Sequence, residues 1–222
     1  MFIGHFALGL AAKKAAPRQS LAVLFAAAQL ADLLWPVLVF AGVEHVRIDP
    51  GNTAMTPLDF VSYPYSHSLA TLLVWAVLFA FVFAREPSPA TPWVLMGLVV
   101  SHWVLDFVTH RPDMPLYPGG QKVGLGLWHS VPATVIVETA MFAAGLWVYI
   151  RATRARDAIG RWATLALVVL LLASYAGNIL GGAPPSVDAI IIAGTIGGVI
   201  LLALSAWADA HREASPDVAG FR

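Results

Sequence analysis

Long apolar runs separated by short polar segments follow one another along this chain. Six of the runs have about 20 residues, the length that an α-helix needs to cross the hydrocarbon core of a bilayer. Charged residues, prolines and glycines bound each run, as is typical of helix ends. The runs cover residues 20–43, 65–84, 92–110, 129–150, 162–180 and 187–207. The pattern predicts an all-α fold, a polytopic transmembrane helix bundle with six long spans.

A seventh apolar run, residues 2–16, is too short for a standard span. Such a segment can cross where the bilayer is locally thinned, or it can lie as a half-inserted helix. If it crosses with its N-terminus outside, His5 reaches the depth of the polar residues described below. We then expect seven crossings, and otherwise six plus a short N-terminal hydrophobic helix.

The composition supports a membrane protein. Hydrophobic residues make up 59% of the chain, charged residues 12%, and the mean hydropathy is +0.74, whereas a soluble domain carries roughly a quarter charged residues. The net charge of zero gives no basic field for nucleic acid. Cysteine is absent, which excludes thiolate metal sites and cysteine nucleophiles.

The length predicts a single domain, residues 1–222, with a polar half over about 1–150 and packing helices over about 160–208. In the packing helices, Gly177 and Gly181, and likewise Gly194 and Gly198, recur every four residues. Such spacing is typical of faces where helices approach closely.

Lys and Arg are distributed unequally between the two sides of the predicted spans. Counting along alternate loops, ten of the thirteen lie on the side that holds Lys13, Lys14, Arg85, the 151–161 segment and the C-terminus with Arg222. Cytoplasmic loops carry such an excess. We therefore expect a cytoplasmic C-terminus, with a short cytoplasmic tail at 209–222.

Three acidic residues, Asp32, Asp106 and Glu138, fall inside predicted spans. An acidic residue at mid-helix costs roughly 2.5–3.5 kcal/mol on the insertion scale, so each needs protonation, a hydrogen-bond partner, a basic residue or a bound cation. The spans contain almost no Lys or Arg to act as partners.

His102 and Asp106 lie one helical turn apart on one face, with His110 about 80° round from His102. Imidazole and carboxylate at this spacing can ligate one divalent ion. They can equally hydrogen-bond to each other as two buried polar groups. The pair alone does not distinguish a metal site from such a hydrogen bond.

Other polar residues favour a metal site. With alternating span directions, Asp32 and His102 fall near mid-depth, and His67 and His110 fall in the same outer half of the bilayer as Asp106. The predicted ligands are therefore His5, Asp32, His67, His102 and Asp106. The loop carboxylates Asp59 and Asp113 are expected to be solvated.

These residues resemble, in order, the motifs of a bacterial inner-membrane family known as membrane-bound metal-dependent hydrolases. The resemblance covers about residues 1–116 and rests on Gly4-His5, Asp32, His67-Ser68, Ser101-His102, Leu105-Asp106 and Thr109. It implies a membrane-embedded divalent metal, with zinc expected, and hydrolysis of a lipid or phosphoester near the outer half of the bacterial inner membrane. Where the family has Pro-Asp-x-Asp, this chain has Leu30-Ala31-Asp32, so one ion is expected rather than two.

In this reading a metal activates water and polarises the scissile ester, and His110 or a spare carboxylate, Glu138, acts as catalytic general base. Arg111 and Lys122 can attract an anionic head group. One alternative is a divalent cation or proton transporter that uses the same His and Asp residues as a relay. Another is a scaffold whose buried polar groups fix helix register, without bound metal.

Overall fold

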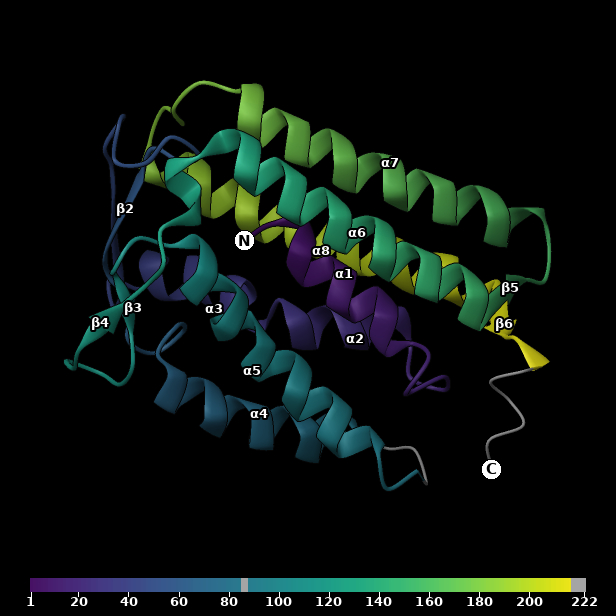
Figure 1. Ribbon diagram of the computed structural model, residues 1–222. Coiled ribbons are helices and arrows are strands. Elements are labelled where there is room, and N and C mark those ends of the chain that lie inside the picture. The colour runs from purple at the N-terminus through teal and green to yellow at the C-terminus, as the bar shows by residue number, and fades with distance from the viewer. Residues whose placement is uncertain (85–87, 217–222) are drawn as a thin grey trace.

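The protein is seen in a computed structural model that describes residues 1–84 and 88–216, and it is mainly helical (Figure 1). Arg85, Arg222 and the end of the expected tail, 217–222, lie outside the described residues. The helices are α1 (Ile3–Ala12), α2 (Leu21–Ala28), α3 (Leu30–Phe40), α4 (Leu69–Phe83), α5 (Thr91–Thr109), α6 (Val131–Ala152), α7 (Ala158–Leu180) and α8 (Val187–Ala210), with a 3₁₀ turn η1 at Leu127–His129.

The membrane character of the chain is confirmed by its helices. Within the described residues, α5, α6, α7 and α8, of 19 to 24 residues, are long and apolar enough to cross a bilayer. The bent pair α2 and α3 makes a fifth span if it is counted as one. Six long spans are therefore more than the helices themselves provide, because α4 has 15 residues and α1 has 10.

The start of α4 explains part of this difference. The apolar run at 65–84 was expected to be helical throughout, but Ser68 is the N-cap and its side chain accepts a hydrogen bond from the backbone N–H of Thr71. A serine in this position ends the preceding turn and starts the helix. His67 therefore stands in the turn before α4 rather than inside a span.

The apolar run at 20–43 is two helices that meet at Gln29 with a bend of 61°. The break leaves the carbonyl of Ala28 at the end of α2 and places Asp32 in the first turn of α3. Carbonyls at a helix C-terminus lack intrahelical partners, and the N-terminus of a helix favours negative charge. The break thus supplies two polar groups inside the bundle.

Helix α1 is buried among the other helices, with α6 and α2 on either side of it (Figure 1). Ten residues of α-helix extend only about 15 Å, half of a bilayer core. A Cβ atom at Gly145 of α6 would lie 2.3 Å from the backbone oxygen of Ala7. This close approach of two backbones holds α1, and with it His5, in the centre of the bundle.

Short antiparallel strand pairs occupy the two ends of the bundle (Figure 1). At one end, β5 (Thr153–Ala155) pairs with β6 (Arg212–Ala214). At the other end, β1 (His45–Ile48) pairs with β2 (Leu58–Ser62), and β3 (Met114–Pro115) with β4 (Lys122–Val123). The expected tail from residue 209 is thus helix to Ala210 and then a paired strand.

The glycines of the last two helices divide into two kinds. In α8, a Cβ at Gly198 would lie 2.9 Å from Leu33 and one at Gly194 3.2 Å from Pro36, so α8 packs closely on α3 there. In α7, a Cβ at Gly177 would meet nothing within 4 Å. The expected close packing therefore does not hold at Gly177, which lines a groove instead.

Candidate metal centre

Four separate parts of the chain bring histidines and aspartates together in the bundle. Among the described residues, two groups have side-chain ligand atoms within 4.8 Å of one another: His5, His102 and Asp106, and Asp32, His67 and His102. All five predicted ligands belong to these groups, which share His102. Their convergence is a property of the structure, and their role as metal ligands stays a prediction.

Asp106, on α5, lies at the centre of the cluster and is almost fully buried. Its Oδ1 is 3.0 Å from His5 Nε2 and also accepts a hydrogen bond from the amino group of Met1. Its Oδ2 faces three imidazole Nε2 atoms, at 3.1 Å from His102, 3.9 Å from His67 and 3.9 Å from His110. Oδ2 is therefore the oxygen that the histidines surround.

Two of these rings are fixed by hydrogen bonds at the opposite nitrogen. His102 Nδ1 donates to the carbonyl of Ala28 at 2.8 Å, the group left at the break between α2 and α3. His67 Nδ1 is 2.7 Å from Ser66 Oγ, which itself donates to Glu44 Oε2 at 2.6 Å. Because the Ser66 hydroxyl proton is already used, His67 Nδ1 is the donor in this pair.

His110 is held in the same way from the loop that follows α5. Its Nδ1 donates to Asp113 Oδ1 at 3.0 Å, and this oxygen also accepts from the hydroxyl of Tyr63 at 2.9 Å. Burial raises the pKa of Asp113, but the hydrogen bonds from His110, Tyr63 and Arg111 outweigh burial and leave that pKa below its ordinary value. Asp113 is thus a carboxylate that orients His110.

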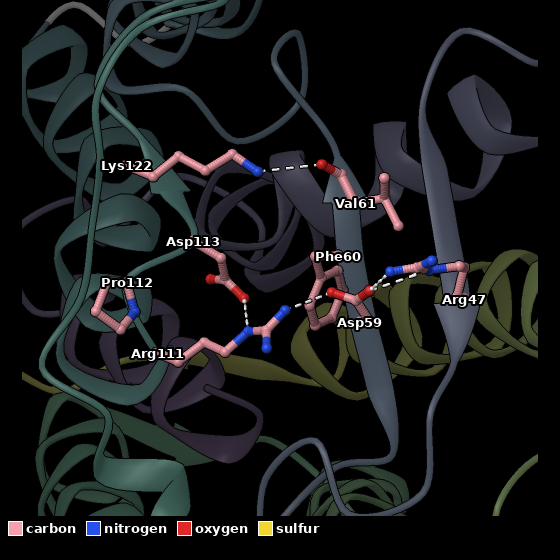
Figure 2. A pocket seen from close by; sticks show the side chains of 8 residues that line it. All are labelled: Arg47, Asp59, Phe60, Val61, Arg111, Pro112, Asp113 and Lys122. Atoms are coloured by element: carbon pink, nitrogen blue, oxygen red, sulfur yellow. Dashed lines mark hydrogen bonds and ion pairs between the residues drawn. The ribbon is translucent and has the colours of Figure 1, made fainter.

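The expectation that Asp59 and Asp113 are solvated is wrong, because both residues are buried. They line a pocket of about 410 Å³ at the end of the bundle that carries β1 to β4, and Figure 2 shows Arg111 between the two carboxylates. Asp59 accepts hydrogen bonds from Arg47 and Arg111, and Lys122 Nζ donates to the carbonyl of Val61 at 3.1 Å. Each cation of this pocket already has a partner.

The hydrogen bond at Nδ1 fixes the tautomer of each ring, and the tautomer determines the role of Nε2. A neutral imidazole that donates through Nδ1 carries only a lone pair on Nε2. In the neutral form of His67 and His102 that lone pair faces carboxylate oxygens, and His102 Nε2 has no hydrogen-bond partner in the part of the chain that the structure describes. Two hydrogen-bond acceptors that face each other in a buried site repel each other unless a positive charge lies between them.

The spacing of these atoms fits a zinc ion. Bonds of about 2.0–2.1 Å in a tetrahedral site place neighbouring ligand atoms roughly 3.3 Å apart. Asp32 Oδ1 is 3.4 Å from His67 Nε2 and 3.8 Å from His102 Nε2, and His102 Nε2 is 3.1 Å from Asp106 Oδ2. Hydrogen bonds that fix the opposite ring nitrogen are typical of histidine ligands to metals.

Glu138, the predicted catalytic carboxylate of α6, has a different position. Its Oε2 accepts hydrogen bonds from the backbone N–H groups of Phe2 at 2.8 Å and Gly4 at 3.2 Å. The carboxylate thereby satisfies free N–H groups at the start of α1. Glu138 contacts the segment that carries His5, and it is not among the grouped ligands.

The residues that orient the rings were not foreseen. Ser66 is adjacent to His67, so a hydroxyl partner could have been considered from the sequence. Glu44 is 22 residues before Ser66, and no spacing rule relates the two positions. The Ala28 carbonyl becomes available only through the bend at Gln29.

Comparison of the chain with protein-family models, with curated proteins and with solved structures finds no match. The function is therefore inferred from the geometry of the site.

Proposed function

We propose that this protein is a membrane-embedded hydrolase that uses one divalent metal ion, zinc, to cleave a lipid or phosphoester substrate. The observation that supports it is the set of imidazole Nε2 atoms, oriented by hydrogen bonds at Nδ1, that face the oxygens of Asp32 and Asp106.

The cluster residues divide into those that hold the ion and those that act on the substrate. The side chains proposed to hold the ion belong to two overlapping groups that share His102: His5, His102 and Asp106, and Asp32, His67 and His102. When bound, the ion supplies Lewis acidity that polarises an ester and activates water. Asp32 is the open side of the cluster, since 44% of its side chain is exposed while those of His67, His102 and Asp106 are buried.

His110 is the proposed general base. Its Nε2 lies on the cluster side, 3.9 Å from Asp106 Oδ2, and its Nδ1 is held by Asp113 at 3.0 Å. A base oriented by a carboxylate at its second nitrogen accepts a proton at a fixed position. Glu138 is assigned the lesser role of holding the N-terminus of α1 in place.

The proposal includes six long crossings of a bacterial inner membrane, with α4 and the α2–α3 pair added to the four long helices. The end with Lys13, β5 and β6 is taken as cytoplasmic. Lys13, Arg154 and Arg212 lie together at that end, through the Lys13–Asp209 ion pair and the β5–β6 pairing. The positive-inside rule favours this orientation.

The direct test is metal content and hydrolysis of the detergent-purified protein. We expect close to one equivalent of zinc by mass spectrometry, and cleavage of bis-p-nitrophenyl phosphate or of dioleoylphosphatidylglycerol vesicles. His102→Ala with Asp106→Ala is expected to lose both metal and turnover. The control is His129→Ala, an exposed histidine outside the cluster, which is expected to retain both.

Two results would overturn the proposal. Wild-type protein without stoichiometric metal would mean that protonated histidines neutralise Asp32 and Asp106 as ion pairs. Bound metal without turnover, together with zinc or proton flux in liposomes, would identify a transporter that uses the same residues.

A separate prediction concerns the orientation of His110. Asp113→Asn is expected to lower turnover by about 10- to 100-fold, the range typical of lost outer-sphere partners, while metal content stays unchanged. Asp49→Asn, at an exposed aspartate between β1 and β2, is the matched control. Equal turnover of the two variants would show that Asp113 and His110 take no part in the reaction. Loss of zinc in Asp113→Asn would show that Asp113 stabilises the metal site instead.

A further inference from the structure

A long groove runs beside the candidate metal centre. It has a volume of about 840 Å³, and it lies between α3, α7 and α8 and the segment that joins β1 to β2. This volume is within the range of roughly 300–1,000 Å³ that is typical of sites for small ligands. Most of its lining residues are apolar or small.

The groove walls belong to helices that face hydrocarbon. Only 6% of the most apolar window of α8, and 28% of that of α7, is buried inside the protein. Helices of this kind in a membrane protein contact lipid on their exposed faces. An occupant of the groove is therefore taken from the hydrocarbon of the bilayer rather than from water.

Glycines give the groove its depth. Cβ atoms added at Gly177 of α7 and Gly197 of α8 would meet nothing within 4 Å, although both residues line the groove. These two glycines are therefore not needed for helix contact. The space that they leave is open to a flexible chain.

The end of the groove near the metal centre is polar. Asp32 lines it, as do Gln29 and Trp35. Gln29 is 7% exposed and Trp35 8%, yet Gln29 Oε1 and Trp35 Nε1 have no hydrogen-bond partner within residues 1–84 and 88–216. Buried polar atoms normally have partners, but these two atoms are almost inaccessible from the groove. Asp32, whose side chain is 44% exposed, is therefore the polar side chain that this end of the groove offers to a ligand.

We propose that the groove holds the acyl chain of a bilayer phospholipid, with the polar part of that lipid beside Gln29, Trp35 and Asp32. The substrate then enters sideways from the bilayer, with its chain against Gly177 and Gly197. This inference rests on the proposed hydrolase function, and it narrows the substrate from any phosphoester to a lipid with a long acyl chain.

The test fills the groove with leucine side chains at positions where an added Cβ meets no other part of the protein. Gly177→Leu and Gly197→Leu are expected to lower hydrolysis of dioleoylphosphatidylglycerol at least tenfold, and to change zinc content and hydrolysis of water-soluble bis-p-nitrophenyl phosphate less than twofold. Gly97→Leu is the matched control, because Gly97 also has open space at its Cβ but lies on α5 outside the groove. It is expected to behave as wild type with both substrates.

A second measurement does not depend on hydrolysis. Phosphatidylglycerol with a photoreactive diazirine in its acyl chain is expected to label the groove segments 174–185 and 189–202 in nanodiscs. Gly197→Leu is expected to reduce this labelling, and Gly97→Leu is not. The inference would be overturned by equal labelling of Gly197→Leu and Gly97→Leu. It would also be overturned if Gly177→Leu and Gly197→Leu both hydrolysed the lipid at the wild-type rate. If the wild-type protein hydrolyses neither substrate, the proposed hydrolase function is wrong. The labelling still shows whether the groove binds an acyl chain.

Discussion

Removal of divalent metal is expected to lower the apparent unfolding temperature of the detergent-solubilised protein by about 10 °C. An ion at 1,000 times its dissociation constant stabilises the folded state by about 4 kcal/mol, and each kcal/mol is worth about 2–4 °C in a chain of this size. The reason is local. Without an ion, the Nε2 atoms of the buried His67 and His102 face the carboxylates of Asp32 and Asp106, and these negative charges lack a bound cation. Thermal unfolding with and without a chelator, followed by re-addition of zinc, measures the effect.

The control for chelation is His67→Ala with His102→Ala, in which the metal site is lost but the remainder of the bundle is kept. Its unfolding temperature is expected to be the same with and without chelator. If wild type and this variant respond equally, the chelator acts elsewhere and the cluster is not a metal site.

Lys13→Met is expected to destabilise the protein by about 3–5 kcal/mol, the cost typical of leaving one partner of a buried ion pair alone. Lys13 Nζ lies 2.6 Å from Asp209 Oδ2, and the two side chains are only 7% and 9% exposed. The same oxygen accepts from the backbone N–H of Leu21 at 3.1 Å, so this pair joins α1, α2 and α8. Unfolding measured with denaturant in detergent gives the difference.

Two variants separate the ion pair from the charge alone. Lys14→Met removes an exposed lysine next to Lys13 and is expected to change stability little. Lys13→Met with Asp209→Asn removes both charges and keeps an acceptor for Leu21, so it is expected to recover most of the lost stability. A double variant as unstable as Lys13→Met would show that packing of the lysine chain, rather than the pair, is what matters.

The sequence is most informative about the site where ligands share one element. His102 and Asp106 are one turn apart on α5, and helix geometry alone predicts that they share a face. Their position relative to Asp32 and His67 follows from span direction and depth, since polar residues at the same depth in adjacent helices tend to meet. Asp32, His67 and Asp106 each lie in one of the two groups, and His102 lies in both.

Hydropathy is less informative about where helices begin and end. The polar segment 65–68, Tyr-Ser-His-Ser, directly precedes the apolar run and was included in the predicted span, but Ser68 caps α4 and leaves His67 in a turn. Likewise, Gln29 interrupts an apolar run without a glycine or proline at the break. Such bends depend on tertiary packing, and a hydropathy window averages over them.

The partners of the imidazole Nδ1 atoms were the least predictable part of the site. Each is a carbonyl, a hydroxyl or a carboxylate, and such groups are common in every loop. Asp113 follows His110 by three residues, but only burial distinguishes it from a solvated aspartate. Long-range pairs such as Ser66 and Glu44 leave no local pattern.

The position of α1 in the centre of the bundle has a consequence for biosynthesis. Every predicted ligand precedes residue 107, whereas α6, which packs closely against α1, begins at Val131. Chains emerge from the ribosome N-terminus first, so the five ligands are all synthesised before the helix that encloses His5. Until α6 is made, α1 therefore lacks the helix that packs closely against it, so the enclosure of His5 is a late step of assembly.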